Sequence, residues 1–207
     1  MFYSLLIAVL MAYLLGNLNG SVCVSAMVSD DDVRKHGSGN AGLTNFIRNY
    51  GVGKAIYVIL IDAGKAVIAC VAAGMLLEPY DLYMEGKVLG GLCVMLGHIF
   101  PALLGGKGGK GILSGLFIAL SVDWRIAALI LGVFLISYLL TWYVSLGSVL
   151  ASVTFAIGFV IFYHDSILVM IGGVAMGLLA VFMHRGNIAR LFKGQERKTN
   201  LFAKGKQ

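Results

Sequence analysis

Long runs without a charged residue constrain this chain more than any other feature. Residues 1–29 carry no charge, only 13% of the 207 residues are charged, and 59% are hydrophobic. The mean hydropathy is +0.89, and an apolar helix of about 20 residues is long enough to cross a bilayer. The sequence therefore predicts an all-α integral membrane protein in which residues 1–207 form a single membrane-embedded domain.

Seven charge-poor segments predict seven helices, at residues 1–28, 53–77, 88–104, 112–122, 126–142, 144–163 and 167–183. Segment 112–122 has only eleven residues, so it is either a short crossing or a re-entrant segment. With six crossings, the seven basic residues of the tail would lie opposite the other basic loops, against the Lys/Arg excess of cytoplasmic loops. We therefore predict a seven-transmembrane-helix bundle with one short helix, the N-terminus outside and the basic C-terminal tail, from about residue 184, in the cytoplasm.

The net charge of +6 does not indicate a nucleic-acid partner, because the basic residues are scattered among loops and the tail. Residues 1–29 lack a basic leader and a clear small-residue cleavage site, which predicts a retained first helix instead of a signal peptide. Cys23, Cys70 and Cys93 fall in apolar segments without metal-ligand spacing, so we expect unpaired, buried thiols.

The first of three polar segments covers residues 37–48. Its glycines permit tight turns, while Ser38, Asn40, Thr44 and Asn45 supply neutral hydrogen-bonding groups. Arg48 offers a planar guanidinium suited to a phosphate or a carboxylate. An ordinary polar connection is the alternative at this point.

The second polar segment covers residues 97–111, with His98 close to Pro101 and a glycine loop at residues 105–111. The loop consists of Gly105, Gly106, Lys107, Gly108, Gly109, Lys110 and Gly111. Glycines can turn backbone N–H groups toward one point, and lysines add positive charge, so the loop predicts a phosphate site. No Gly-Lys pair is followed by Ser or Thr, which argues against an ATPase. Simple positive-inside anchoring of the two lysines is the alternative.

The third polar segment covers residues 184–194. His184, Asn187, Ile188 and Leu191 share one helical face, whereas the basic side chains lie off it. An interfacial amphipathic helix is the alternative, but it does not explain why the shared face begins with a histidine and an asparagine. If the three segments meet at one membrane face, they could bind phosphate groups while staying open to a lipid tail.

Asp62 and Lys65 lie inside the second predicted span, three residues apart on one helical face. Because unpaired charges in hydrocarbon are costly, we expect them to pair with each other. A structural ion pair and a functional site both remain open for these two residues.

In these segments the sequence resembles the bacterial acyl-phosphate-dependent glycerol-3-phosphate acyltransferases, the PlsY family. The family's three signature motifs look like residues 37–48, 97–111 and 184–194, in the same order, and the resemblance covers nearly the whole chain. It implies acyl transfer from long-chain acyl phosphate to the 1-hydroxyl of glycerol 3-phosphate, giving lysophosphatidic acid and phosphate, the first acylation of bacterial phospholipid synthesis. By resemblance Ser38, Arg48, His184 and Asn187 are catalytic, while Asn40, Thr44, Asn45, His98 and the glycine loop bind substrate.

The resemblance further implies a multi-pass protein of the bacterial inner membrane with its active site at the cytoplasmic face. It implies no cofactor or metal ion, and it implies a soluble acyl-phosphate-producing enzyme as a partner. The chain departs from the family pattern at Gly186, where glutamate is usual, and at Ala41, Leu43 and residues 17–19. A diverged paralogue is therefore one alternative.

Two further function classes are weighed against this hypothesis. A small transporter for an anionic metabolite would place polar groups near mid-membrane and often shows internal repetition, whereas here only Asp62 and Lys65 lie deep. An acyltransferase that uses acyl-carrier protein or acyl-CoA normally carries a His-x4-Asp motif. No histidine of this chain has aspartate five residues later.

Overall fold

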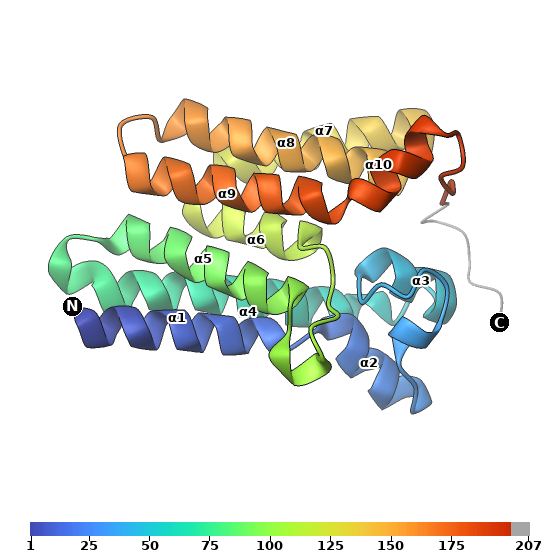
Figure 1. The fold of residues 1–207 in the computed structure, drawn as a ribbon, viewed down its shortest axis with the longest axis horizontal. Helices are drawn as coiled ribbons and strands as arrows, with labels where there is room; N and C mark the ends of the chain where they lie inside the picture. Colours follow the sequence, from blue (N-terminus) through green and yellow to red (C-terminus); the bar gives the residue numbers. More distant parts are fainter. Residues whose placement is uncertain (200–207) are drawn as a thin grey trace.

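The long helices lie side by side along the long axis of the molecule and form a bundle (Figure 1). The computed structural model describes residues 1–199. The N-terminus lies at one end of the bundle and α10 lies at the other (Figure 1). In chain order the helices are α1 (Phe2–Asn17), α2 (Gly20–Ser29), α3 (Leu43–Tyr50), α4 (Ala55–Leu77), α5 (Tyr83–Ile99), α6 (Ile112–Val122), α7 (Trp124–Thr141), α8 (Val144–Phe162), α9 (Ile167–Met183) and α10 (Arg185–Phe192).

The predicted all-α membrane architecture is confirmed, and α6 and α9 match their predicted bounds. Among the described residues, five helical segments are long and apolar enough to cross a membrane, or six if α9 and α10 form one span bent by 54°. The short helix α6 falls below the length of a full crossing. Length alone therefore gives a smaller number of spans than the seven predicted.

The first predicted helix, residues 1–28, is wrong as a continuous element, because it breaks between α1 and α2. Buried charges from α4 satisfy the backbone groups that this break exposes. The Lys65 ammonium donates to the Leu18 carbonyl at 2.6 Å, and the Asp62 carboxylate accepts from the Gly20 N–H at 3.1 Å. The Asn19 side chain caps α2. Partners of this kind allow a helix to break at membrane depth.

Two further boundaries differ from prediction. Segment 88–104 starts earlier and ends earlier, since α5 covers Tyr83–Ile99 and a separate short turn follows Pro101. Proline lacks an N–H and disfavours helix in the residue before it, which accounts for the stop. The loop at residues 29–52 contains the eight-residue helix α3. This helix was not predicted, because it has many polar residues and no apolar run.

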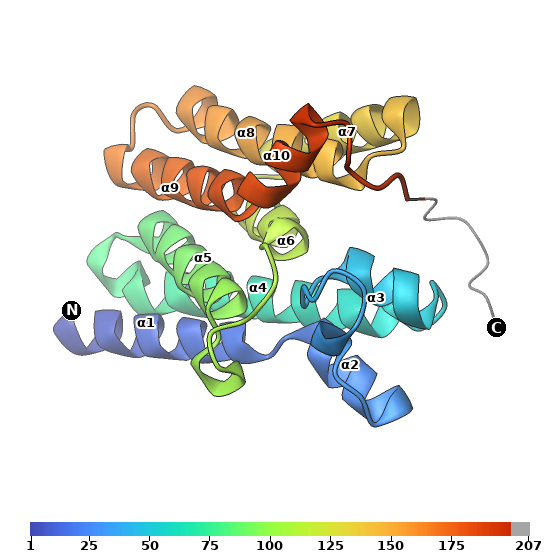
Figure 2. The same ribbon diagram turned by 45° about the vertical axis from the view of Figure 1, so that its right-hand side comes forward.

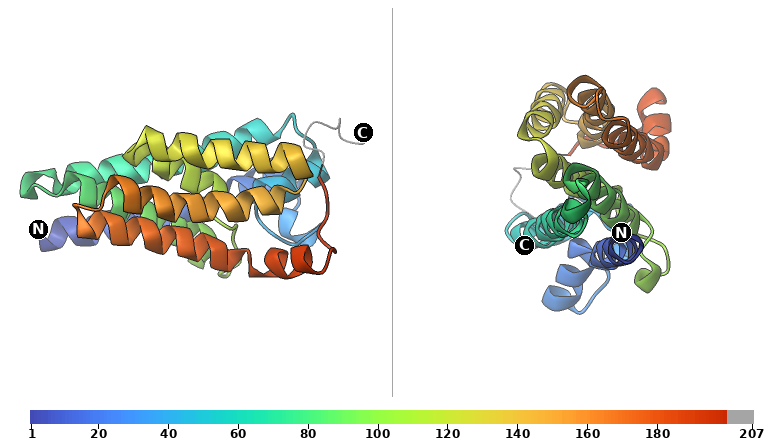
Figure 3. Two further views of the ribbon diagram at one scale, coloured as in Figure 1. Left: turned by 90° about the horizontal axis from the view of Figure 1, so that it is seen from above. Right: turned by 90° about the vertical axis from the view of Figure 1, so that its left-hand side faces the viewer.

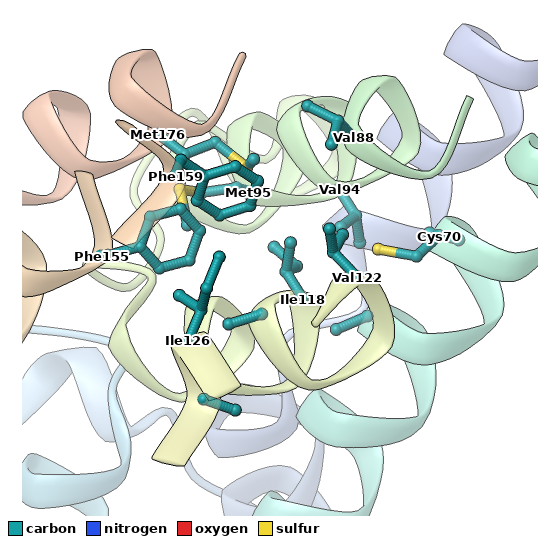
Figure 4. Packing of buried hydrophobic residues seen from close by; sticks show 14 of the residues in the cluster. Cys70, Val88, Val94, Met95, Ile118, Val122, Ile126, Phe155, Phe159 and Met176 are labelled. Atoms are coloured by element: carbon teal, nitrogen blue, oxygen red, sulfur yellow. The ribbon is translucent and has the colours of Figure 1, made fainter. Parts of the chain in front are cut away.

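The helices divide into two groups on either side of α6. Helices α1, α4 and α5 lie together on one side, and α7, α8 and α9 lie together on the other, as Figure 2 and Figure 3 show. The buried side chains of both groups meet around Ile118 of α6, with Val94 and Met95 from one side and Phe155 and Phe159 from the other (Figure 4). Helix α6 therefore supplies the centre of the core and joins the two groups.

Close packing across the core depends on small residues. A Cβ atom at Gly173 of α9 would lie 1.9 Å from the Phe159 ring of α8, so this glycine lets the two helices approach. The three cysteines are unpaired, as predicted, and Cys70 and Cys93 are buried. The expected burial is wrong for Cys23, which is only partly buried.

Candidate active site

A pocket of about 860 Å³ lies where α3, the glycine loop and α10 meet at one end of the bundle. Polar residues from all three segments singled out in the sequence line it. They are Ser38, Asn40, Thr44, Asn45, Arg48, His98, Lys110, His184 and Asn187, and Gly111 lines the pocket beside Lys110. The three segments therefore meet as predicted, while the chemical role of each residue stays a prediction.

The rest of the glycine loop lies off this lining, namely Gly105, Gly106, Lys107, Gly108 and Gly109. Its amides bind the chain that precedes them. The Gly106 N–H donates to the Pro101 carbonyl at 2.8 Å, and the Gly109 N–H donates to the His98 carbonyl at 3.1 Å. The expectation that these N–H groups converge on a phosphate is therefore wrong for Gly105, Gly106, Gly108 and Gly109, because each of them already donates to a carbonyl of residues 98–102.

The glycines instead allow the loop to pass close to α5 and to enter α6. A Cβ atom at Gly109 would lie 2.1 Å from His98 Nε2. Gly111 has a φ of +83°, a left-handed conformation that favours glycine, and it directly precedes α6. Lys110 lies between these two residues, so the tight path of the backbone fixes where its side chain starts.

Lys110 reaches across the pocket to the third polar segment. Its ammonium donates to the side-chain oxygen of Asn187. Burial, together with the positive charges of Arg190 and Arg48, lowers the pKa of Lys110 to about 8. Lys110, Arg48 and Arg190 place several positive charges around this end of the pocket beside the Glu196 carboxylate, so a bound phosphate would add negative charge where cations are in excess.

His184 and Asn187 come from the junction of α9 and α10. Both side chains are buried, whereas Arg185 and Arg190 are exposed, so the predicted division between two faces of this segment is confirmed. His184 Nδ1 lies 2.8 Å from the Ala180 carbonyl, which can only accept. The ring therefore donates from Nδ1 and keeps a lone pair on Nε2 for a proton acceptor role.

Asn45 holds the first polar segment in shape. Its side-chain amide donates to the backbone carbonyls of Val33, His36 and Asn40, at 3.0–3.1 Å. Its side-chain oxygen accepts from the Ser38 N–H at 3.0 Å. The Asn45 side chain is buried, so its main use is to place the loop on which Ser38 and Asn40 face the pocket.

Arg34 joins the first polar segment to the glycine loop. Its guanidinium forms an ion pair with Asp32 at 2.8 Å. It also donates to the carbonyls of Leu104 at 2.7 Å and Lys107 at 3.2 Å. The hydrogen bonds from Arg34 lower the pKa of the Asp32 carboxyl. The Lys107 backbone is therefore held while its side chain stays exposed.

The predicted pair of Asp62 and Lys65 is confirmed, with the ammonium 2.8 Å from the carboxylate. Both side chains are almost fully buried. Lys65 Nζ also lies 2.8 Å from His98 Nδ1, so the lysine donates and the histidine presents Nε2–H toward the glycine loop. His98 thus connects the buried ion pair to the floor of the pocket.

An apolar groove continues the pocket away from its cationic end. Its walls come from α6, α7 and α8, and they include Leu113, Leu116, Ile130, Phe134 and Ala151. A small void of about 20 Å³ adjoins the groove, and Leu116, Ile130 and Ala151 line both spaces. A single pocket therefore offers a site for phosphate at one end and for a hydrocarbon chain at the other.

Sequence reasoning missed Glu196, which lies beyond the third polar segment. Its carboxylate accepts from the Asn187 amide at 2.9 Å and from Arg190 Nε at 2.7 Å. Burial raises the pKa of Glu196, but these hydrogen bonds outweigh it and lower the pKa overall. The signal was available, because Glu196 is the sole acidic residue in the basic tail from residue 184 onward.

Comparison with known proteins assigns this chain to a family. The family model for glycerol-3-phosphate acyltransferase matches residues 6–194, which contain all three polar segments. The chain belongs to the glycerol-3-phosphate acyltransferase family. Membership is consistent with its apolar helices, and the protein is an integral membrane acyltransferase.

Members of the glycerol-3-phosphate acyltransferase family match over nearly their whole length. The family member of Prochlorococcus marinus is 37% identical over 191 residues, covering 91% of this chain and 94% of its own. That of Finegoldia magna is 36% identical over 195 residues, covering 94% and 96%. The resemblance seen in the three polar segments is therefore confirmed at the level of the family.

Two crystal structures of PlsY, an integral membrane glycerol 3-phosphate acyltransferase, share the fold. The glycerol 3-phosphate form has a TM-score of 0.85 and 30% identity, and covers 97% of this chain and all of that one. The lysophosphatidic acid form has a TM-score of 0.83 and 31% identity, and covers 96% of both chains. Each ligand belongs to that protein, and both combine a phosphate with a glycerol backbone.

Proposed function

We propose that this protein transfers a fatty acyl group from acyl phosphate to the 1-hydroxyl of glycerol 3-phosphate, giving lysophosphatidic acid and inorganic phosphate. The observation that carries this proposal is the joining of two chemically different spaces in one pocket. Lys110 and Arg48 make one end cationic, and the groove along α6, α7 and α8 is apolar. A phosphorylated acceptor and a lipid donor fit these two spaces.

The donor itself determines how much the protein has to do. Acyl phosphate is a mixed anhydride with an activated carbonyl and a good leaving group, so no covalent enzyme intermediate is required. The hydroxyl oxygen attacks the acyl carbon, an ester bond forms, and the acyl–phosphate bond breaks. Catalysis then rests on placing the two reactants together and on stabilising the charge that develops.

The pocket residues take their roles from their positions. Lys110 and Arg48 neutralise the phosphate groups, which need cationic donors. Ser38 and Asn187 are the hydrogen-bond donors for the reacting oxygens. His184 Nε2 or a substrate phosphate oxygen accepts the proton that leaves the attacking hydroxyl. The fixed Nδ1–H bond to Ala180 keeps the Nε2 lone pair of His184 available.

The proposed topology has seven crossings, with α6 as the short one and α1 and α2 as a single broken crossing. The N-terminus is outside and the pocket faces the cytoplasm of a bacterial inner membrane, where the family's soluble donor-producing enzyme is the expected partner. Two features support this arrangement: the N-terminus and α10 lie at opposite ends of the bundle (Figure 1), and α10 is basic.

The test is turnover by the purified protein in detergent or lipid mesophase, supplied with palmitoyl phosphate and labelled glycerol 3-phosphate. We expect labelled lysophosphatidic acid without CoA, ATP or added metal. The variant Arg48→Ala, purified in the same way, is the control for contaminating activity. Turnover with acyl-CoA or acyl-carrier protein, and none with acyl phosphate, would overturn the donor. Accumulation of glycerol 3-phosphate in vesicles without esterification would favour a transporter.

A further inference from the structure

Arg48 has a partner that lies beyond the part of the chain matched by the family model. Its Nη2 atom donates to the Oγ1 atom of Thr199, 151 residues later in the sequence. The family match ends at residue 194. Thr199 is only 6% exposed, although it is the last residue that the structure describes.

The backbone of Thr199 is held on both sides by the end of α7. Its N–H donates to the carbonyl of Trp142 at 3.0 Å, and its own carbonyl accepts from the Tyr138 hydroxyl at 3.0 Å. Trp142 has a left-handed φ of +62°, which turns the chain between α7 and α8. Two hydrogen bonds thus fix the Thr199 backbone at the place from which its hydroxyl reaches Arg48.

The segment from residue 195 to 199, here called the C-terminal strap, runs along the polar end of the pocket. Gln195, Glu196 and Arg197 line the pocket, and Glu196 binds Asn187. Figure 2 shows the chain leaving α10 and passing the end of α7. The strap therefore starts at one pocket wall and ends at Arg48 on another.

An arginine at the end of an eight-residue helix needs such a partner. Its side chain carries about 2 kcal/mol of rotamer entropy, which binding a phosphate would have to overcome. A hydroxyl that accepts from one Nη2 hydrogen holds the guanidinium in place and leaves its other donors for a ligand.

We propose that Thr199 is a positioning residue, which orients Arg48 for the phosphate of the substrate. This inference rests on the proposed function, because it assumes that glycerol 3-phosphate binds in the pocket. Thr199 acts through Arg48 and has no contact with the reacting atoms.

The experiment compares Thr199→Val with Thr199→Ser in the full-length protein. Valine keeps the size and the two backbone hydrogen bonds but removes the hydroxyl, whereas serine keeps the hydroxyl. We expect Thr199→Val to raise the KM for glycerol 3-phosphate about tenfold, as for the loss of a hydrogen bond to a charged group. We expect kcat to change by less than about threefold, and Thr199→Ser to match the wild type.

A double-mutant cycle separates positioning from a general effect on the fold. In the Arg48→Lys background, which lacks the Nη2 donor, Thr199→Val should change KM by less than about twofold. An unchanged KM in the single variant, an equal factor in both backgrounds, or a fall in KM would each overturn the inference. A fall would show that Thr199 competes with the substrate for Arg48.

Two outcomes need a further measurement. If Thr199→Val does not fold, Tyr138→Phe removes the donor to the Thr199 carbonyl and should raise KM in the same direction, and an unchanged KM there would overturn the inference. If the wild type does not acylate glycerol 3-phosphate, the proposed function fails, whereas normal wild-type turnover with an unchanged variant defeats the role of Thr199 alone.

Discussion

A hydrogen bond from the Lys110 ammonium to the Asn187 side-chain oxygen joins the glycine loop to α10, 77 residues later in the chain. The Asn187 amide group in turn donates to Glu196. The three side chains form a chain of contacts in which Lys110 is the end that carries positive charge into the pocket. In the proposed reaction, a ligand phosphate that takes over the Lys110 donor would free the Asn187 side chain from this contact.

The two lysines of the glycine loop should differ in importance. Lys110 lines the pocket, whereas Lys107 is exposed and off the lining. We expect Lys110→Ala to raise the KM for glycerol 3-phosphate by about tenfold or more, because a hydrogen bond to a charged group contributes about 1.5–3 kcal/mol. Lys107→Ala, with the same change in charge, should stay within about threefold. Equal effects of the two variants in steady-state kinetics would contradict this assignment.

Binding of glycerol 3-phosphate should weaken above about pH 8. Burial and the charges of Arg190 and Arg48 lower the pKa of Lys110 to about 8. Because the pKa is lowered, Lys110 is charged below pH 8 and loses its charge above it. KM, measured at saturating acyl phosphate, should therefore rise toward about tenfold per pH unit once the pH is well above 8.

The matched control for this pH dependence is Lys110→Arg, whose guanidinium stays charged throughout the range. Its KM should remain nearly constant between pH 7 and pH 9.5, whatever its absolute value. If the wild type and this variant gave parallel KM profiles, another group would have to be responsible.

The wall that the apolar groove shares with the small void should influence which acyl chain lengths the protein accepts. Leu116, Ile130 and Ala151 line both the groove and the small void. Leu116→Ala should join the two spaces and shift the preference toward longer acyl phosphates, while Ala151→Leu should shift it toward shorter ones. Each methylene contributes about 0.8 kcal/mol, or about fourfold in relative kcat/KM.

Competition between acyl phosphates of different length, with products separated by mass, measures this preference directly. Leu139→Ala serves as the control, because Leu139 is an exposed residue of α7 that is not on the groove lining. An unshifted product distribution in both groove variants would show that the acyl chain lies elsewhere.

Removing Lys65 should destabilise the fold strongly. Its ammonium is paired with the buried Asp62 carboxylate and binds the Leu18 carbonyl at the break between α1 and α2. Lys65→Met leaves that carboxylate uncompensated, which costs about 3–5 kcal/mol. Lys54→Met makes the same substitution at an exposed position near the start of α4, and should change the unfolding free energy by only about 0.5 kcal/mol. Urea unfolding in detergent compares the two, and a similar stability for both would refute the structural role of the pair.

The helices and the Asp62–Lys65 pair could be predicted because each follows from local sequence. Runs without charge require a bilayer or a core, and two opposite charges three residues apart share a helical face. The same reasoning correctly predicted that His184 and Asn187 lie on a different helical face from the basic side chains of the third polar segment. It also overlooked the break at Leu18, because the groups that satisfy that break come from α4.

The glycine loop and the C-terminal strap show what local sequence leaves out. Glycine shows that a tight path is allowed, but it does not show that Gly106 and Gly109 bond to the carbonyls of Pro101 and His98. The contact between Arg48 and Thr199 depends on how the tail folds back over the pocket. The residues next to Arg48 and Thr199 in the sequence do not indicate how the tail folds back.

The length of α6 has a consequence for how the two reactants meet. Helix α6 has eleven residues and α7, which follows it directly, has 18. At 1.5 Å per residue, α6 begins about 10 Å short of the far end of α7. In the proposed topology Gly111 therefore sits below the headgroup level. Under the proposed function, a water-soluble acceptor would reach Gly111 through the polar end of the pocket and an amphiphilic donor would enter laterally from the leaflet. Neither reactant would then have to leave its own phase before the ester bond forms.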